Sequence, residues 1–229
     1  MFRPLSDAEL KFVVQMKSAH ISVGPRENIV EAGQVGASLM TLFDGWAVRY
    51  RRGIGGRRHI LSLLLPGDLV AAESALLGRV EHSVMALTPV TLCVLDGRTV
   101  AQLFGAHTDL ALALYRNQLE EMRWFDVEAV NGSTGDAITR VAYVFLHTFD
   151  RLAERGLANG TVCGFPLRRA DLADRVGLSA MHLSRTLAAL KRQRLATLVD
   201  NTLYIPNRPR LARLVHYPSP DEGRKRALL

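Results

Sequence analysis

The spacing of apolar residues changes character along the chain. Between residues 20 and 96 the apolar segments are short and separated by turn signals such as Asp44-Gly45, a pattern that predicts a β-sandwich or barrel-like roll. The expected strands are 28–31, 38–43, 46–51, 58–64, 84–87 and 90–95. A short amphipathic helix over residues 5–18, with a capping box at Ser6 and Glu9, is expected to precede the roll.

A long helix is predicted over residues 107–131, which contain neither proline nor glycine. Residues at alternating spacings of three and four form a heptad-like stripe along it, typical of a dimer seam and interrupted by Asp126. The apolar members of this stripe are Leu112, Tyr115, Leu119, Met122 and Ala129. The alternative is a helix that lies on its own domain. We favour the seam because the helix has a second apolar face, which includes Trp124 and Val127.

Residues 131–133, Asn-Gly-Ser, are predicted to end this helix, to mark the domain boundary and to serve as a hinge. Residues 136–155 are expected to resume as a helix with its own apolar face.

The stretch from residue 167 to residue 199 has the pattern of a helix–turn–helix. Apolar positions at helical spacing are interrupted by Gly177 and then resume, and Ser179 is a suitable N-cap for the second helix. Two short apolar segments then flank Asp200-Asn201, a two-residue hairpin turn, which predicts a wing. A helical hairpin in an ordinary core is the alternative interpretation.

The charge distribution favours the DNA-binding interpretation of this motif. The chain carries a net charge of +7. From Gly135 to the end there are 16 lysines and arginines against 8 acidic residues, whereas the first 134 residues carry a net charge of −1. The excess positive charge therefore lies with the helix–turn–helix, where a phosphate backbone would need it.

Several functional classes are disfavoured by composition. The sequence contains no run of about 18 apolar residues, so we expect no membrane span. Acidic residues stand where a signal peptide would have its apolar segment, so we expect a cytoplasmic protein. Two cysteines cannot supply a four-cysteine zinc or iron–sulfur site within one chain. We find no nucleophile–base pattern, phosphate loop or metal-ligand spacing, so we expect no enzyme activity and predict no cofactor.

The order of roll, long helix and winged helix–turn–helix resembles the Crp/Fnr family of bacterial transcription regulators, in particular a divergent branch common in alphaproteobacteria. The matching segments are DGWAVRYR (44–51), GGRRHILSLLLPGDL (55–69), HSVMALTPVTLCVLD (82–96) and LADRVGLSAMHLSRTLAAL (172–190). The resemblance implies an α+β fold: a cyclic-nucleotide-binding-like β-roll sensor (1–106), a dimerisation helix (107–131) and a winged helix–turn–helix DNA-binding domain (132–229). It also implies a homodimer that binds a two-fold symmetric site on double-stranded DNA and recruits or blocks RNA polymerase.

The sequence departs from the cyclic-nucleotide members of this family at the effector pocket. Those members carry Gly-Glu shortly after PGD and Arg-Ser before the next strand, and a neutral histidine is a poor replacement for that arginine. The corresponding residues here are Ala71, Ala72, His82 and Ser83, with Glu73 one position out of register. We therefore expect an effector other than cAMP. Haem or an unknown small ligand is an alternative. The histidines of the sensor half that could serve as haem ligands are His20, His59, His82 and His107.

The reading helix departs from the family pattern as well. Cyclic-nucleotide members place Arg-Glu after the capping serine, where this chain has Ala180 and Met181, and only the later arginine, Arg185, is retained. We predict that Arg185 reads a guanine, that Ala180 and Met181 contact apolar groups such as thymine methyls, and that His182 bonds a base or a phosphate. The expected phosphate contacts are Ser179, Ser184, Arg168 and Arg169.

A second functional class fits the roll alone: a regulatory module that binds a cyclic nucleotide or another small ligand and controls an enzyme or a channel. The winged helix–turn–helix and its positive charge have no role in such a module. A sequence-specific regulator therefore explains more of the chain.

Overall fold

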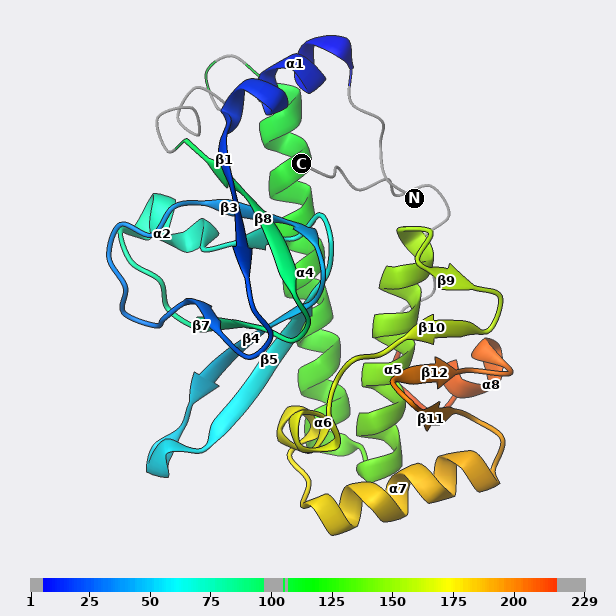
Figure 1. Cartoon of the computed structure of the whole chain (residues 1–229). Helices are drawn as coiled ribbons and strands as arrows, with labels where there is room; N and C mark the ends of the chain where they lie inside the picture. The colour runs from blue at the N-terminus through cyan, green and yellow to red at the C-terminus, as the bar shows by residue number, and fades with distance from the viewer. Residues whose placement is uncertain (1–5, 97–104, 106, 218–229) are drawn as a thin grey trace. The chain divides into compact units, whose positions relative to one another are not determined.

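The computed structural model describes residues 6–96, 105 and 107–217, which fall into two compact units (Figure 1). One unit extends to Asn117 and the other begins at Gln118, so the division lies within the long helix α4 (Thr108–Thr134). The ends of the predicted 1–106 and 132–229 domains lie outside the described residues.

The first unit is an antiparallel roll of two four-stranded sheets, in the orders β1-β8-β3-β6 and β2-β7-β4-β5 (Figure 1). Its elements are α1 (Asp7–Met16), β1 (Lys17–Val23), β2 (Asn28–Val30), β3 (Met40–Asp44), β4 (Ala47–Arg52), η1 (Ile54–Gly56), β5 (Arg58–Leu64), β6 (Leu69–Val70), α2 (Ala72–Leu77), β7 (Ser83–Ala86) and β8 (Val90–Leu95). Buried aliphatic side chains from both sheets, among them Leu42, Val84 and Leu92, form its core. Burial of such side chains is the main driving force for forming this unit.

The six predicted strands match β2, β3, β4, β5, β7 and β8 to within a few residues. The capping box is confirmed, since the Ser6 hydroxyl accepts from the Glu9 N–H and the Glu9 carboxylate accepts from the Ser6 N–H. The predicted helix over 5–18 was too long, because α1 ends at Met16. Residues 17–23 instead pair with β8 as an edge strand whose side chains are mostly exposed, which is why it lacks a clear apolar alternation.

The second unit packs short helices and a small sheet against α5 (Ala137–Glu154) (Figure 1). The other elements are β9 (Ala158–Asn159), β10 (Val162–Gly164), α6 (Arg169–Val176), α7 (Ala180–Arg192), β11 (Thr197–Val199), β12 (Thr202–Tyr204) and α8 (Arg208–Ala212). The strands form one antiparallel sheet in the order β11-β12-β10-β9. In its core Phe145 of α5 meets Phe165 edge to face, with ring centroids 5.2 Å apart. A buried apolar face on α5 therefore organises the unit, as the helical periodicity predicts.

The predicted helix end at residues 131–133 is wrong, because α4 continues through them to Thr134. Asn131 does not cap the helix. Its buried side chain donates to the carbonyl of Val127, while its backbone carbonyl accepts from the N–H of Gly135 at 3.1 Å, so the helical hydrogen bonds continue past it. The break falls at Gly135, after which Asp136 caps α5 by accepting from the Thr139 N–H at 2.8 Å.

The apolar stripe predicted on the long helix is solvent-exposed in the single chain. Met122 is 62% exposed and Tyr115 60% exposed, and the remaining members Leu112, Leu119 and Ala129 are also exposed. By contrast, Val127 on another face of α4 is buried, and the Trp124 ring stacks on His147 of α5. The stripe is therefore not the face by which the helix packs on its own chain.

No helix in the described parts of the chain combines the length and the apolar character that crossing a membrane requires.

Candidate nucleic-acid interface

The turn between α6 and α7 is set by two residues that the sequence singles out. Gly177 has φ +66°, a left-handed conformation in which a side chain would be strained. Ser179 then begins α7, its hydroxyl accepting from the N–H of His182 at 3.2 Å. The predicted N-cap is confirmed, and the Ser179 hydroxyl satisfies one of the backbone N–H groups that are otherwise free in the first turn of α7.

One face of α7 packs inward and the opposite face is exposed. Leu183, Thr186 and Leu190 are buried, and the Thr186 hydroxyl donates to the carbonyl of His182 at 2.9 Å. The residues predicted to contact DNA are all exposed: Arg168, Arg169, Ser179, Ala180, Met181, His182, Ser184 and Arg185. Six of these residues lie at the N-cap and in the N-terminal half of α7, whereas Arg168 and Arg169 lie at the start of α6.

The hairpin β11–β12 follows α7, as the wing prediction requires. Asp200 and Asn201 have φ of 47° and 57°, the paired left-handed conformations of a type I′ hairpin turn. The Asn201 carbonyl accepts from the N–H of Phe165 at 2.6 Å, which joins the turn to the segment that precedes α6. The described unit is thus a winged helix–turn–helix with a defined wing.

Two ion pairs between elements of this unit were not apparent from the sequence. Arg175 of α6 forms an ion pair with Glu128 of α4, and Arg208 of α8 binds Asp150 of α5, Nε to Oδ1, at 2.7 Å. Each pair joins residues 47 or more positions apart. Such pairs leave no local periodicity, so no sequence pattern could have found them.

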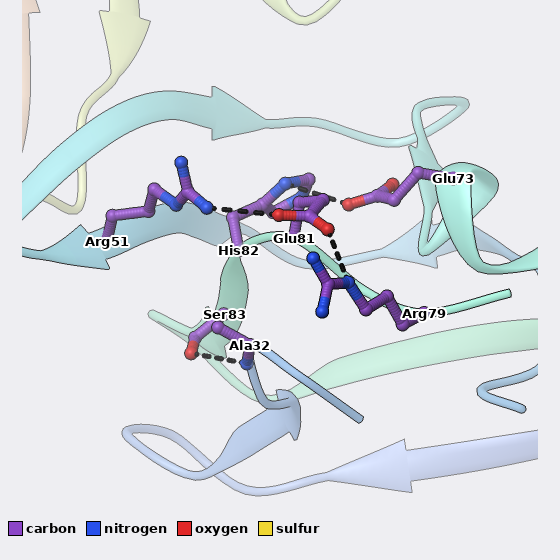
Figure 2. Close-up of polar contacts among 7 residues, drawn as sticks. All are labelled: Ala32, Arg51, Glu73, Arg79, Glu81, His82 and Ser83. Atoms are coloured by element: carbon purple, nitrogen blue, oxygen red, sulfur yellow. Dashed lines mark hydrogen bonds and ion pairs between the residues drawn. The ribbon is translucent and has the colours of Figure 1, made fainter. Parts of the chain in front are cut away.

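The predicted effector-pocket residues come together in the first unit. The Nδ1 atom of His82 lies 2.8 Å from a carboxylate oxygen of Glu73, and both side chains are mostly buried (Figure 2). The hydroxyl of Ser83 accepts from the N–H of Ala32 at 3.0 Å. Ala71 is buried in a left-handed conformation just before α2, and Ala72 is the first residue of that helix.

The contact with His82 favours the ionised form of Glu73. Burial raises the pKa of Glu73. The hydrogen bond and the charge of His82, together with backbone hydrogen bonds, lower this pKa by a larger amount, so the net shift is downward. Nearby, partly exposed Glu81 bridges Arg51 and Arg79 (Figure 2). His82, Arg51 and Arg79 are thus each paired with a carboxylate of the chain itself.

Two family models match the chain. One, described as a Crp-like helix-turn-helix domain, covers residues 139–214, and the other, described as a cyclic nucleotide-binding domain, covers residues 20–107. The chain belongs to the Crp/Fnr family of transcription regulators.

Curated relatives of this Crp/Fnr protein are regulators rather than enzymes. "Transcriptional activatory protein AadR" of Rhodopseudomonas palustris is 26% identical over 80% of this chain and 75% of the relative. "Nitrogen fixation regulation protein FixK" of Bradyrhizobium diazoefficiens is 27% identical over 82% of this chain and 78% of the relative. The solved structure of FixK2 from Bradyrhizobium japonicum superposes with a TM-score of 0.75 at 24% identity, over 88% of this chain and 98% of that chain. That likeness shows the shared fold, and the predicted family and α+β fold class are confirmed.

Proposed function

We propose that this Crp/Fnr regulator acts in the cytoplasm as a homodimer on a palindromic promoter site, with one α7 helix in the major groove of each half-site. The observation that carries the proposal is the exposed face of α7, where the predicted contact residues of this helix are accessible while Leu183 and Leu190 pack inward. Helix–turn–helix regulators read base edges with the N-terminal residues of the second helix. From a promoter site, such a dimer can contact RNA polymerase.

Within this proposal the contact residues divide by chemistry. Arg185 binds guanine O6 and N7 through its guanidinium fork, and Ala180 and Met181 supply apolar contacts. His182 bonds a base or a phosphate. Ser179, Ser184, Arg168 and Arg169 contact phosphates and fix the register of the helix in the groove. The positive charge of the C-terminal part of the chain supports this assignment.

The exposed stripe on α4 is the proposed dimer seam. Its large apolar members, Leu112, Tyr115, Leu119 and Met122, expose 43–62% of their surfaces in the single chain. A contiguous exposed apolar surface of this kind is typical of an interaction site. Pairing with the same stripe of a second copy removes these side chains from water and matches the heptad-like spacing.

The proposed effector is not cAMP, and the proposal requires no cofactor. A cyclic phosphate needs a positive partner, whereas the imidazole of His82 is engaged by Glu73 and the Ser83 hydroxyl by Ala32. An anion entering there would also meet the Glu73 carboxylate. The Glu73–His82 pair therefore supports a roll that is closed to cyclic nucleotides.

Selection of binding sites from a random DNA pool tests the proposed function. Purified protein without added ligand is used at near-physiological salt. The proposal predicts a palindrome with half-sites about one helical turn apart, and unlabelled cAMP leaves the enrichment unchanged. Salt-sensitive binding without any enriched motif contradicts the proposal.

A further inference from the structure

Asn131 joins the end of α4 to a segment that is distant in sequence. Its side chain is 2% exposed, and its amide group donates to the carbonyls of Val127 and His216, both at 2.9 Å. Its carbonyl oxygen accepts from the N–H of His216 at 2.9 Å. One buried amide thus satisfies both backbone groups of a residue that follows α8, 85 positions later.

The same part of α4 is tied to two other elements of the DNA-binding unit. Glu128 pairs with Arg175 of α6, which is the first helix of the helix–turn–helix. Glu121 lies 4.0 Å from Arg151 of α5. Over residues 121–131 the helix is therefore connected to α5, to α6 and to the C-terminal segment.

The junction after Asn131 is closely packed rather than open. A Cβ placed on Gly135 would lie 2.4 Å from the carbonyl oxygen of Asn131, so only glycine fits there. The segment after α8 is held a second time, because the Tyr217 hydroxyl donates to Asp150 at 2.7 Å. Rotation about this junction would break several buried contacts at once, which argues against the hinge expected at residues 131–133.

We propose that Asn131 is a positioning residue that fixes the orientation of α7 relative to the apolar stripe of α4, and so sets the half-site spacing that the dimer accepts. Leu119, Met122 and Ala129 of the stripe lie in the same compact unit as α7. In a dimer joined through the stripe, the separation of the two α7 helices follows from the geometry within this unit. This inference rests on the proposed dimer.

The spacing of the half-sites gives a readout that fold stability alone does not change. One inserted base pair moves a half-site by about 3.4 Å along the DNA axis and rotates it by about one tenth of a turn. If the orientation of α7 relative to α4 is fixed, the dimer loses contacts at one half-site. If that orientation is loosened, α7 can shift to follow the displaced half-site. A variant that is merely less stable binds every spacing less well and leaves the ratio of affinities unchanged.

The experiment measures the affinity of full-length Asn131→Ala for the selected palindrome and for versions with one base pair added or removed at its centre. We expect wild type to prefer the selected spacing about tenfold or more, since one such mismatch in fit costs at least as much as one lost base contact. The expected ratio for Asn131→Ala is about threefold or less, a loss of roughly half the discrimination energy. Ser133→Ala, on the exposed surface of the same helix, is the matched control and keeps the wild-type ratio.

A wild-type ratio in Asn131→Ala, with its fold verified by circular dichroism, overturns the inference. If that variant does not fold, Asn131→Asp takes its place, because its carboxylate keeps an oxygen that can accept from the His216 N–H but cannot donate to the carbonyls of Val127 and His216. An unchanged ratio in Asn131→Asp also overturns the inference. Absence of a palindrome for wild type contradicts the proposed function instead, so the two failures are distinguishable.

Discussion

Arg185 lies on the exposed face of α7, six residues after the N-cap Ser179. If its guanidinium reads a guanine, Arg185→Ala should lower the affinity for the selected site by about 1–3 kcal/mol and relax the preference at one position of each half-site. Binding to the selected site and to its single-base variants measures both effects. Arg169→Ala is the control, because loss of a phosphate contact weakens all sequences alike and reduces the salt slope by about one per protomer. Equal losses on all sequences for Arg185→Ala would show that it contacts only phosphate.

Ionisation of Glu73 makes the stability of the roll depend on pH. Burial raises the pKa of this carboxyl, but His82 and backbone hydrogen bonds together lower it by more, so the folded-state pKa lies below the ordinary value of 4.5. A carboxyl with a depressed folded-state pKa stabilises the fold above its unfolded pKa, and this contribution is lost as the pH falls through the folded value.

Glu73→Gln should therefore lower the free energy of unfolding at pH 7, and its difference from wild type should narrow as the pH drops below 4.5. Urea unfolding at a series of pH values measures this difference. Glu81→Gln, which removes a partly exposed carboxylate nearby, should change stability much less. A pH-independent deficit for Glu73→Gln would mean that the lost interaction is one of packing rather than charge.

At the scale of single elements, two glycines near the end of α4 should respond in opposite ways to the same change. A Cβ at Gly132 meets nothing within 4 Å, and this residue lies inside the helix, so Gly132→Ala should stabilise the protein by about 0.5–1 kcal/mol. A Cβ at Gly135 meets the Asn131 carbonyl, so Gly135→Ala should destabilise it by about 1–3 kcal/mol. Thermal or urea unfolding of the two variants gives the comparison. Similar stabilities would show that the junction is loose.

The elements that the sequence predicted well are those specified by local residues. The capping serines, the left-handed Gly177 and the Asp200-Asn201 turn are each determined by side chains within a few positions, and each is found as predicted. The edge strand β1 was missed because its side chains are mostly exposed and its formation depends on backbone pairing with β8, which is distant in sequence. The helix end at residues 131–133 was misplaced for a related reason.

The end of α4 could not be predicted from neighbouring residues alone. Asn-Gly-Ser is ordinarily a breaker, but the partner that satisfies Asn131 is His216, which no local window includes. For the candidate site, residue types and their exposure on α7 were predictable, whereas the ties that orient α7 were not. Position along one helix is a local property, but orientation between elements is not.

At the scale of the whole molecule, dimer formation should depend on the exposed stripe of α4. Met122→Asp places a charge at its most exposed apolar position and should shift the protein from dimer to monomer at micromolar concentration, because an unpaired buried charge costs several kcal/mol. Sedimentation velocity measures the shift. Leu157→Asp, at an exposed apolar site away from the stripe, is the control and should stay dimeric. A dimeric Met122→Asp would place the interface elsewhere.

Methylation interference on the selected DNA tests directly whether a dimer reads DNA with α7. Methylating guanine N7 blocks the bidentate contact assigned to Arg185. We expect interference at guanines in two patches related by two-fold symmetry and about one helical turn apart. For Arg185→Ala we expect that interference to be lost at one guanine of each patch. A single patch, or a pattern that Arg185→Ala leaves intact, would contradict a dimer that reads DNA with α7.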